Sequence, residues 1–256
     1  AILLAYAKMT LYDELLPSSL PDDQQLIDDL YLYFPKPLQQ AYQQDISRHR
    51  LRREIIATAV TNSLVNRVGP SFLHVMKERT GKTASDITRA YAITRSTFNL
   101  RQLWSGIEEL DNKVKANIQL QLFVIINRMA EAATLWFLKN GQPSLNIAEH
   151  FQAFSPGINL VAQNLSTLLG DLDRKNWHDN AKQVIEHGAP ENLARAVYAL
   201  EFLEAGLDIV RIAQNLKADV LEVAAVYFKV GDRLQFDWLR DAAMRANKQT
   251  HWDRMA

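Results

Sequence analysis

HRLRREIIATAVTNSLVNRVGP, residues 49–70, is the stretch that decides how this chain folds. At 100° per residue, Leu51, Ile55, Ala59, Asn62 and Asn66 fall along one face of a helix, and Ile56, Val60 and Leu64 form a second apolar stripe beside it. A helix that is apolar on two sides is surrounded by other helices, because each stripe needs a partner to leave water. The stretch predicts a central helix that ends at Gly69-Pro70 and carries two amides on a buried face, where amides normally form structural hydrogen bonds.

The rest of the chain has helical spacing as well, without convincing period-two alternation. It predicts an all-α array of about 12 helices, with Pro156 opening a helix of its own. Thr83 and Asp219 are each followed three positions later by a carboxylate, the arrangement of a capping box. The clearest break is Asn140-Gly141-Gln142-Pro143. It predicts an N-terminal lobe, 1–140, and a C-terminal lobe, 141–256, with one continuous helical domain as the alternative.

Composition narrows the class of protein. The chain is 48% hydrophobic and 23% charged, which suits a globular core, and its 29 basic residues balance its 29 acidic ones. That balance argues against general binding to nucleic acid or to anionic membranes. The absence of cysteine excludes disulfides and thiolate ligands and fits a cytoplasmic location.

Both ends of the sequence read as interrupted helices. The chain opens with AILLAYAKM, without an initiator methionine, and closes with THWDRMA, in which Thr250 suits the cap of a further helix. We therefore expect an excised piece of a longer protein, cut at both ends.

Glycine and histidine positions argue against a self-contained active site. No two of the nine glycines lie closer than twelve residues, whereas a dinucleotide-binding turn needs three within six. The six histidines include no pair spaced to place two metal ligands on one helix face. We predict no catalytic, cofactor-binding or metal-binding residue in the chain.

A basic run is the strongest charge feature. We predict that its arginines form bridges to acidic residues on adjacent helices or on a neighbouring domain. Polar residues of the central helix are expected to contribute to the same contacts. These candidate interdomain or interface contacts are Arg48, Arg50, Arg52, Arg53, Asn62, Asn66 and Arg67. A small anion near Asn62, Asn66 and Arg67 is an alternative. A helix-turn-helix reading is disfavoured because Asp219 and Glu222 would face phosphates.

Several stretches resemble the C-terminal region of the large bacterial NAD-specific glutamate dehydrogenases. They are LLAYAKMTLYDELL (3–16), YFPKPL (33–38), residues 49–70, RQLWSGIEELDNKV (101–114) and VYFKVGDRLQFDWLRD (226–241). The resemblance implies an oxidoreductase of amino-acid catabolism, which converts L-glutamate and NAD to 2-oxoglutarate, ammonia and NADH. The family's catalytic lysine, aspartate and glycine-rich turn have no counterparts in residues 1–256, so we expect this piece to be inactive and to bind no NAD.

Two functions remain open from the sequence. In the first, a helical domain packs on the upstream catalytic domains or on neighbouring subunits of a homo-oligomer, and supports assembly or domain motion. In the second, a free-standing helical adaptor without enzymatic activity binds a partner helix. Apolar exposure concentrated near the two ends of the chain favours the first, and a long apolar groove favours the second.

Overall fold

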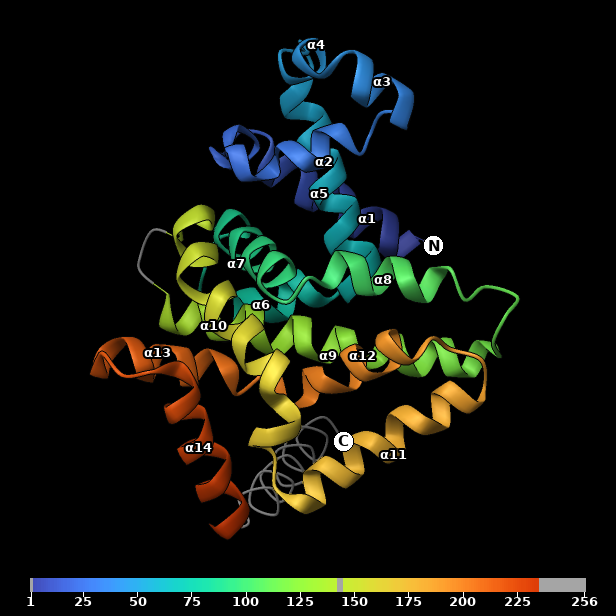
Figure 1. The fold of residues 1–256 in the computed structure, drawn as a ribbon. Coiled ribbons are helices and arrows are strands. Elements are labelled where there is room, and N and C mark those ends of the chain that lie inside the picture. The colour runs from blue at the N-terminus through green and yellow to red at the C-terminus, as the bar shows by residue number, and fades with distance from the viewer. Residues whose placement is uncertain (1, 142–144, 235–256) are drawn as a thin grey trace, which may run out of the picture. The chain divides into compact units, whose positions relative to one another are not determined.

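The computed structural model describes residues 2–141 and 145–234, and every regular element among them is a helix (Figure 1). The predicted all-α class is confirmed. Within this part of the chain there are fourteen α-helices and two short 3-10 helices, more than the sequence predicted. The surplus arises because the region before the central helix is divided by prolines and turns into several short helices.

Cα packing divides the chain into two compact units, residues 1–155 and 156–256. The division falls inside a helix rather than at the Asn140–Pro143 break, and the division into lobes 1–140 and 141–256 remains a prediction.

The first unit holds nine complete α-helices and the start of a tenth. They are α1 (Ile2–Leu15), α2 (Ile27–Tyr31), α3 (Lys36–Ala41), α4 (Gln43–Ser47), α5 (Arg52–Val68), α6 (Phe72–Thr80), α7 (Ala84–Thr97), α8 (Leu100–Glu108), α9 (Ala116–Asn140) and α10 (Ile147–Leu168). The 3-10 helices Leu20–Asp22 and Gln24–Leu26 lead from α1 into α2.

The helix predicted to be central is α5. Its buried stripe includes Ile56, Val60 and Leu64, and it packs against α1, α2, α7 and α9. Gly69 ends it at a φ of 98°, a left-handed region that favours glycine, so the predicted end is confirmed. The prediction that both amides lie on a buried face is wrong, because Asn66 is exposed and Asn62 only half-buried. Leu51 is also exposed, because α5 begins one residue after it.

The most enclosed helix in this unit is α7. It packs against α1, α5, α6, α8 and α9, and ten of its 14 residues are buried. Its N-terminus carries the predicted capping box. The Thr83 hydroxyl accepts from the Asp86 amide at 3.2 Å, and the Asp86 carboxylate accepts from the Thr83 amide at 3.3 Å. Asp219 likewise accepts from the Glu222 amide at 3.1 Å.

One predicted helix start is wrong. Pro156 does not open a new helix but lies inside α10, which runs unbroken through 22 residues. Proline removes one backbone donor from a helix, and here the loss is tolerated because buried apolar residues on both sides of it, Phe154 and Ile158, hold the helix in place.

The second unit comprises the rest of α10 and four further helices. These are α11 (Asp171–Glu186), α12 (Glu191–Leu203), α13 (Gly206–Leu216) and α14 (Val220–Leu234). α10 and α13 approach closely through two glycines. A Cβ atom on Gly157 would lie 2.6 Å from Val210 Cγ2, and one on Gly206 would lie 2.6 Å from Ile158 Cδ1. A side chain at position 157 would force Val210 to move, and one at position 206 would displace the end of the Ile158 side chain.

Candidate functional site

The predicted basic run divides into exposed and bound arginines. Arg48 and Arg50 are exposed, and Arg52 is half-buried at the start of α5. Arg53 instead reaches the end of α1, where its Nη2 donates to the carbonyls of Leu16 at 2.8 Å and Ser18 at 3.0 Å. Its Nη1 pairs with Asp22. Arg53 therefore joins α5 to α1 within the unit, and contacts of the run with other domains remain a prediction.

Arg67 lies at the other end of α5. Its Nη1 pairs with Glu108 of α8 at 2.5 Å, and its guanidinium lies 5.2 Å from the ring centre of Trp104. This pair joins α5 to α8, and the alternative of a small anion at Asn62, Asn66 and Arg67 stays a prediction.

A buried ionic cluster is the main polar feature that the sequence reasoning missed. Asp29 of α2 is 5% exposed. Its carboxylate accepts from Arg95 Nη1 at 3.1 Å and Nη2 at 2.7 Å, and from Arg101 Nη2 at 2.7 Å. Arg95, on α7, also donates to the Ser63 hydroxyl at 3.2 Å, and Ser63 Oγ lies 3.1 Å from the Tyr91 hydroxyl. One carboxylate thus links α2, α7 and α8.

Burial and neighbouring charges both shift the pKa values of the residues in this cluster. Burial lowers the pKa of Arg95, but the attraction of Asp29 outweighs it and the pKa is raised overall. Burial and the neighbouring Arg95 lower the pKa of Arg101. Burial raises the pKa of Tyr91, although Arg95 and the Ser63 hydrogen bond oppose it. The cluster holds its charges through pairing, which is how buried charges persist in a protein interior.

In helix α1, apolar side chains are exposed, whereas in the ionic cluster charged side chains are buried. Its first residues are apolar but exposed, with Ile2 at 88%, Leu3 at 64%, Tyr6 at 68% and Met9 at 66%. Apolar side chains surround the helix on all sides, and only Leu11 and Leu15, near its C-terminal end, are buried. A helix that is apolar all round is normally a buried helix. The exposed first half of α1 therefore has the composition of an interface.

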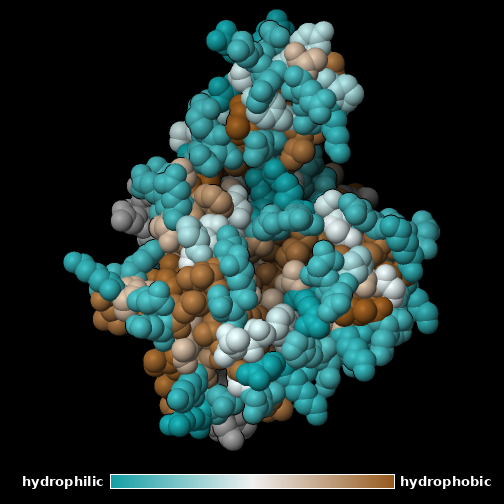
Figure 2. Space-filling model, in the orientation of Figure 1, coloured by the Kyte–Doolittle hydropathy of each residue, from teal (hydrophilic) through white to brown (hydrophobic). Residues whose placement is uncertain are grey.

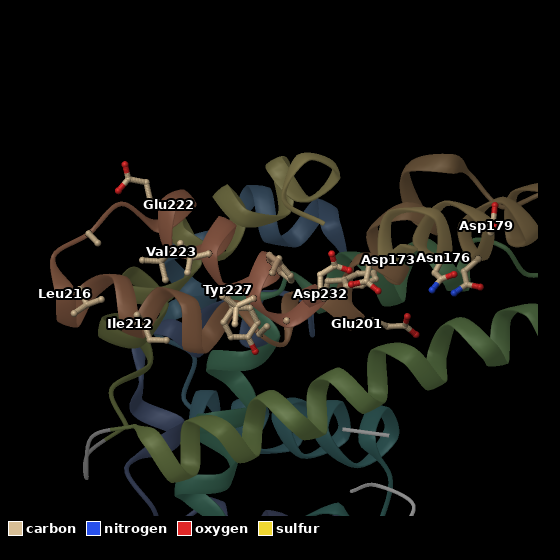
Figure 3. A pocket seen from close by; sticks show the side chains of 18 residues that line it. Asp173, Asn176, Asp179, Glu201, Ile212, Leu216, Glu222, Val223, Tyr227 and Asp232 are labelled. Atoms are coloured by element: carbon tan, nitrogen blue, oxygen red, sulfur yellow. The ribbon is translucent and has the colours of Figure 1, made fainter. Parts of the chain in front are cut away.

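A pocket of about 950 Å³ lies in the second unit (Figure 3). α11, α12, α13 and α14 supply its walls, and the residues between α13 and α14 contribute Ala218. Its apolar part includes Ile212, Leu216, Val223, Val226 and Val230, and its acidic residues are Asp173, Asp179, Glu201, Glu222 and Asp232. Among the described residues that line it, there is no lysine, arginine or histidine. Figure 2 shows part of the apolar surface over α13 and α14.

The apolar residues near the ends of the described chain are not the only exposed ones. α1 lies at one end, and the exposed face of α13 and α14 approaches the other. A third group lies around α2, α3 and α4, and comprises Leu32, Tyr33, Leu38, Tyr42 and Leu51. Exposed apolar residues therefore occur near both ends of the described chain and also between them.

Histidines and carboxylates of the described residues are not grouped as metal ligands. This part of the chain holds no cluster of three or more histidines and carboxylates placed for a metal ion. His178 stacks on Trp177, and its Nδ1 lies 2.7 Å from Arg195 Nη1. No helix in residues 2–141 or 145–234 is both long and apolar enough to cross a membrane.

Comparison with known proteins then identifies the family. The family described as "Glutamate dehydrogenase, C-terminal" matches residues 1–256. This chain belongs to that family. It is 34% identical to the NAD-specific glutamate dehydrogenase of Pseudomonas aeruginosa, 32% to that of Halomonas elongata and 29% to that of Mycobacterium tuberculosis. Each comparison covers the whole chain but only 16% of the relative.

The predicted resemblance is therefore confirmed, and the chain corresponds to the C-terminal domain of these dehydrogenases. The relatives are much longer than this chain, so in them the domain is one part of a larger polypeptide.

Proposed function

We propose that this chain is a non-catalytic helical domain of an NAD-specific glutamate dehydrogenase, and that α1 packs against another part of the same polypeptide or against a neighbouring subunit. The exposed apolar first half of α1 carries the proposal. Burying each of its large side chains would contribute about 1.5–3 kcal/mol. Such an energy is sufficient to hold a domain in a fixed place, since interdomain interfaces are otherwise polar and mobile.

In this proposal the chemistry belongs to the rest of the enzyme. The whole enzyme oxidises L-glutamate to 2-oxoglutarate and ammonia and passes a hydride to NAD, in the cytoplasm and as a homo-oligomer. Residues 1–256 bind no NAD themselves. They support assembly or limit the opening and closing of the catalytic domains, a motion that sets the rate in many enzymes.

Aspartate substitution in the full-length enzyme tests the role of α1. Tyr6→Asp with Met9→Asp places two charges on the proposed interface, and we expect loss of activity or a changed oligomeric state. Leu172→Asp is the matched control, because Leu172 on α11 is also 66% exposed but lies away from α1 in the sequence. Analytical ultracentrifugation and steady-state kinetics report the two effects. A Tyr6→Asp, Met9→Asp enzyme identical to the control would contradict the proposal.

Deletion gives a coarser test of the same idea. We expect removal of residues 1–256 from the full-length enzyme to reduce solubility, assembly or activity. An enzyme that retains all three without these residues has no need of the domain, and the proposal fails.

A protein-interaction adaptor remains a second candidate, and the pocket on α11–α14 is the observation that favours it. Its apolar and acidic lining residues suit an amphipathic helix with a basic face. Family membership favours the first function over this one. Val226→Asp in the pocket separates them, since an adaptor loses partner binding while the α1 interface, and with it assembly, is unaffected.

A further inference from the structure

In the ionic cluster of the first unit, one arginine, Arg101, forms hydrogen bonds with only some of its donors. Arg95 is 5% exposed and divides its donors between Asp29 and Ser63. Arg101 is 39% exposed and gives a single hydrogen bond, from Nη2 to Asp29, among the contacts of the described chain. A guanidinium has five N–H donors, so Arg101 retains donors while its position is fixed by a buried carboxylate.

Arg101 lines a pocket of about 520 Å³ in the same unit. α2 supplies Asp28, Tyr31 and the adjacent Leu32, and α3 and α4 supply Gln39, Gln40 and Gln43. The Asp28 carboxylate accepts no hydrogen bond from any residue that the structure describes, although its charge acts on both Arg95 and Arg101. The volume lies within the range of about 300–1,000 Å³ found for small-molecule sites.

The charges of this pocket select a particular class of ligand. A simple anion would be attracted by Arg101 and repelled by Asp28. A simple cation would be attracted by Asp28 and repelled by Arg101. A zwitterion matches both groups. The glutamine amides add donors and acceptors without charge, and Gln39 is held in place by a 2.7 Å bond from its Nε2 to the Phe34 carbonyl. The wall therefore offers a positive group, a negative group and neutral amides.

We propose that this pocket binds a free α-amino acid with a polar side chain. Arg101 receives the α-carboxylate, Asp28 receives the α-ammonium group, and Gln39, Gln40 and Gln43 form hydrogen bonds with the side chain. Asp29 and Arg95 act as positioning residues, because they hold Arg101 at the pocket wall before any ligand arrives. Such preorganisation reduces the entropy that binding costs. The proposal is independent of the packing of α1.

Three small molecules test the charge requirement. L-glutamine carries both charged groups, glutaramate is the same molecule without the amine, and 4-aminobutanamide lacks the carboxylate. Titration of the ¹⁵N-labelled 256-residue chain, followed at the side-chain amide signals of Gln39, Gln40 and Gln43, measures each affinity. We expect saturable shifts with L-glutamine and affinities weaker by about tenfold or more for both analogues, because each loses a charge-assisted hydrogen bond. Equal binding of either analogue, or no saturable shift with L-glutamine, overturns the proposal.

Variants locate the binding at these residues. Arg101→Gln and Asp28→Asn are each expected to weaken L-glutamine binding by about tenfold or more. Arg50→Gln, at an exposed arginine outside the pocket, is the control and should bind as the native chain does. Where Arg101→Gln disturbs the fold through Asp29, Asp28→Asn remains decisive, since Asp28 is exposed. Native affinity in Asp28→Asn overturns the assignment.

Discussion

α1 and α7 are helices of equal length, 14 residues each, with opposite relations between composition and burial. α1 is apolar on all sides, yet its first half is exposed. α7 carries threonines and two arginines, yet ten of its residues, Arg95 among them, are buried. The difference lies in the partners, since α7 meets five helices of its own unit and a carboxylate pairs with each of its arginines. Hydrophobicity thus indicates that a helix will be covered, and the surrounding chain determines what covers it.

For the buried helix α7, the largest effect is expected from removing the Asp29 carboxylate, which pairs with Arg95. Asp29→Ala leaves Arg95 buried without its partner, and breaking a buried pair costs about 3–5 kcal/mol. We expect a loss of that size in the free energy of unfolding, measured by urea denaturation of the chain. Asp28→Asn, one residue earlier and exposed, should change it by less than about 0.5 kcal/mol. Equal effects of the two would show that the cluster contributes nothing specific.

Truncating one apolar side chain on each helix compares the two directly. Ile93 on α7 is fully buried, and Ile93→Ala should cost about 2–5 kcal/mol. Leu3→Ala on α1 should cost less than about 0.5 kcal/mol in the 256-residue chain, because Leu3 is exposed there. In the full-length enzyme we expect a larger cost for Leu3→Ala. A Leu3→Ala effect that is equally small in both would remove the reason to place α1 in an interface.

The cap of α7 gives a smaller effect. Thr83→Ala removes the hydroxyl that accepts from the Asp86 amide, and we expect a loss of about 1 kcal/mol. Ser96→Ala, at an exposed position near the other end of the same helix, is the control and should be close to neutral. Thermal unfolding of the three proteins provides the measurement, and a cap variant as stable as Ser96→Ala contradicts the expectation.

Tyr91 of α7 makes the stability of the fold depend on pH in the alkaline range. Its pKa is raised in the folded chain, so the folded state retains a proton that the unfolded tyrosine loses near pH 10. Its contribution to stability is complete below that pH and is lost as the pH rises through the higher folded value. Tyr91→Phe should cost about 0.5–1.5 kcal/mol at neutral pH through the lost contact with Ser63, and should flatten the fall in stability above pH 10. An unchanged slope in urea denaturation at several alkaline pH values would contradict this.

Much of the fold follows from local signals. The all-α class, the end of α5 at Gly69 and the cap at Thr83 depend on residues within a few positions of one another, and the sequence predicts all three. Asn66 was misplaced because periodicity identifies a face but not whether another helix reaches that far along it. The sequence wrongly predicts that Pro156 opens a helix, because proline is favoured at the first helical position, whereas here it lies inside α10 between buried neighbours.

The ionic cluster and the pocket beside it could not be predicted from sequence in this way. Asp29 and Arg95 lie 66 positions apart, and nothing local distinguishes Arg95 from an exposed arginine. The relation of the basic run to other domains stays a prediction, because it depends on surfaces outside residues 1–256. The glycine spacing argues against a dinucleotide-binding turn, and the expectation that these residues bind no NAD stays a prediction.

The attachment of Arg53 to the end of α1 has a mechanical consequence. A helix rises about 1.5 Å per residue, so α1 is a stiff rod about 20 Å long. One end is fixed to α5 by Arg53 and to α6 by the 2.7 Å pair between Glu14 and Lys77, and the other end projects. A force applied near Ile2 is therefore converted into a torque on α5 and α6. Under such a force α1 would rotate about its C-terminal end, where the contacts of Arg53 and Lys77 hold it.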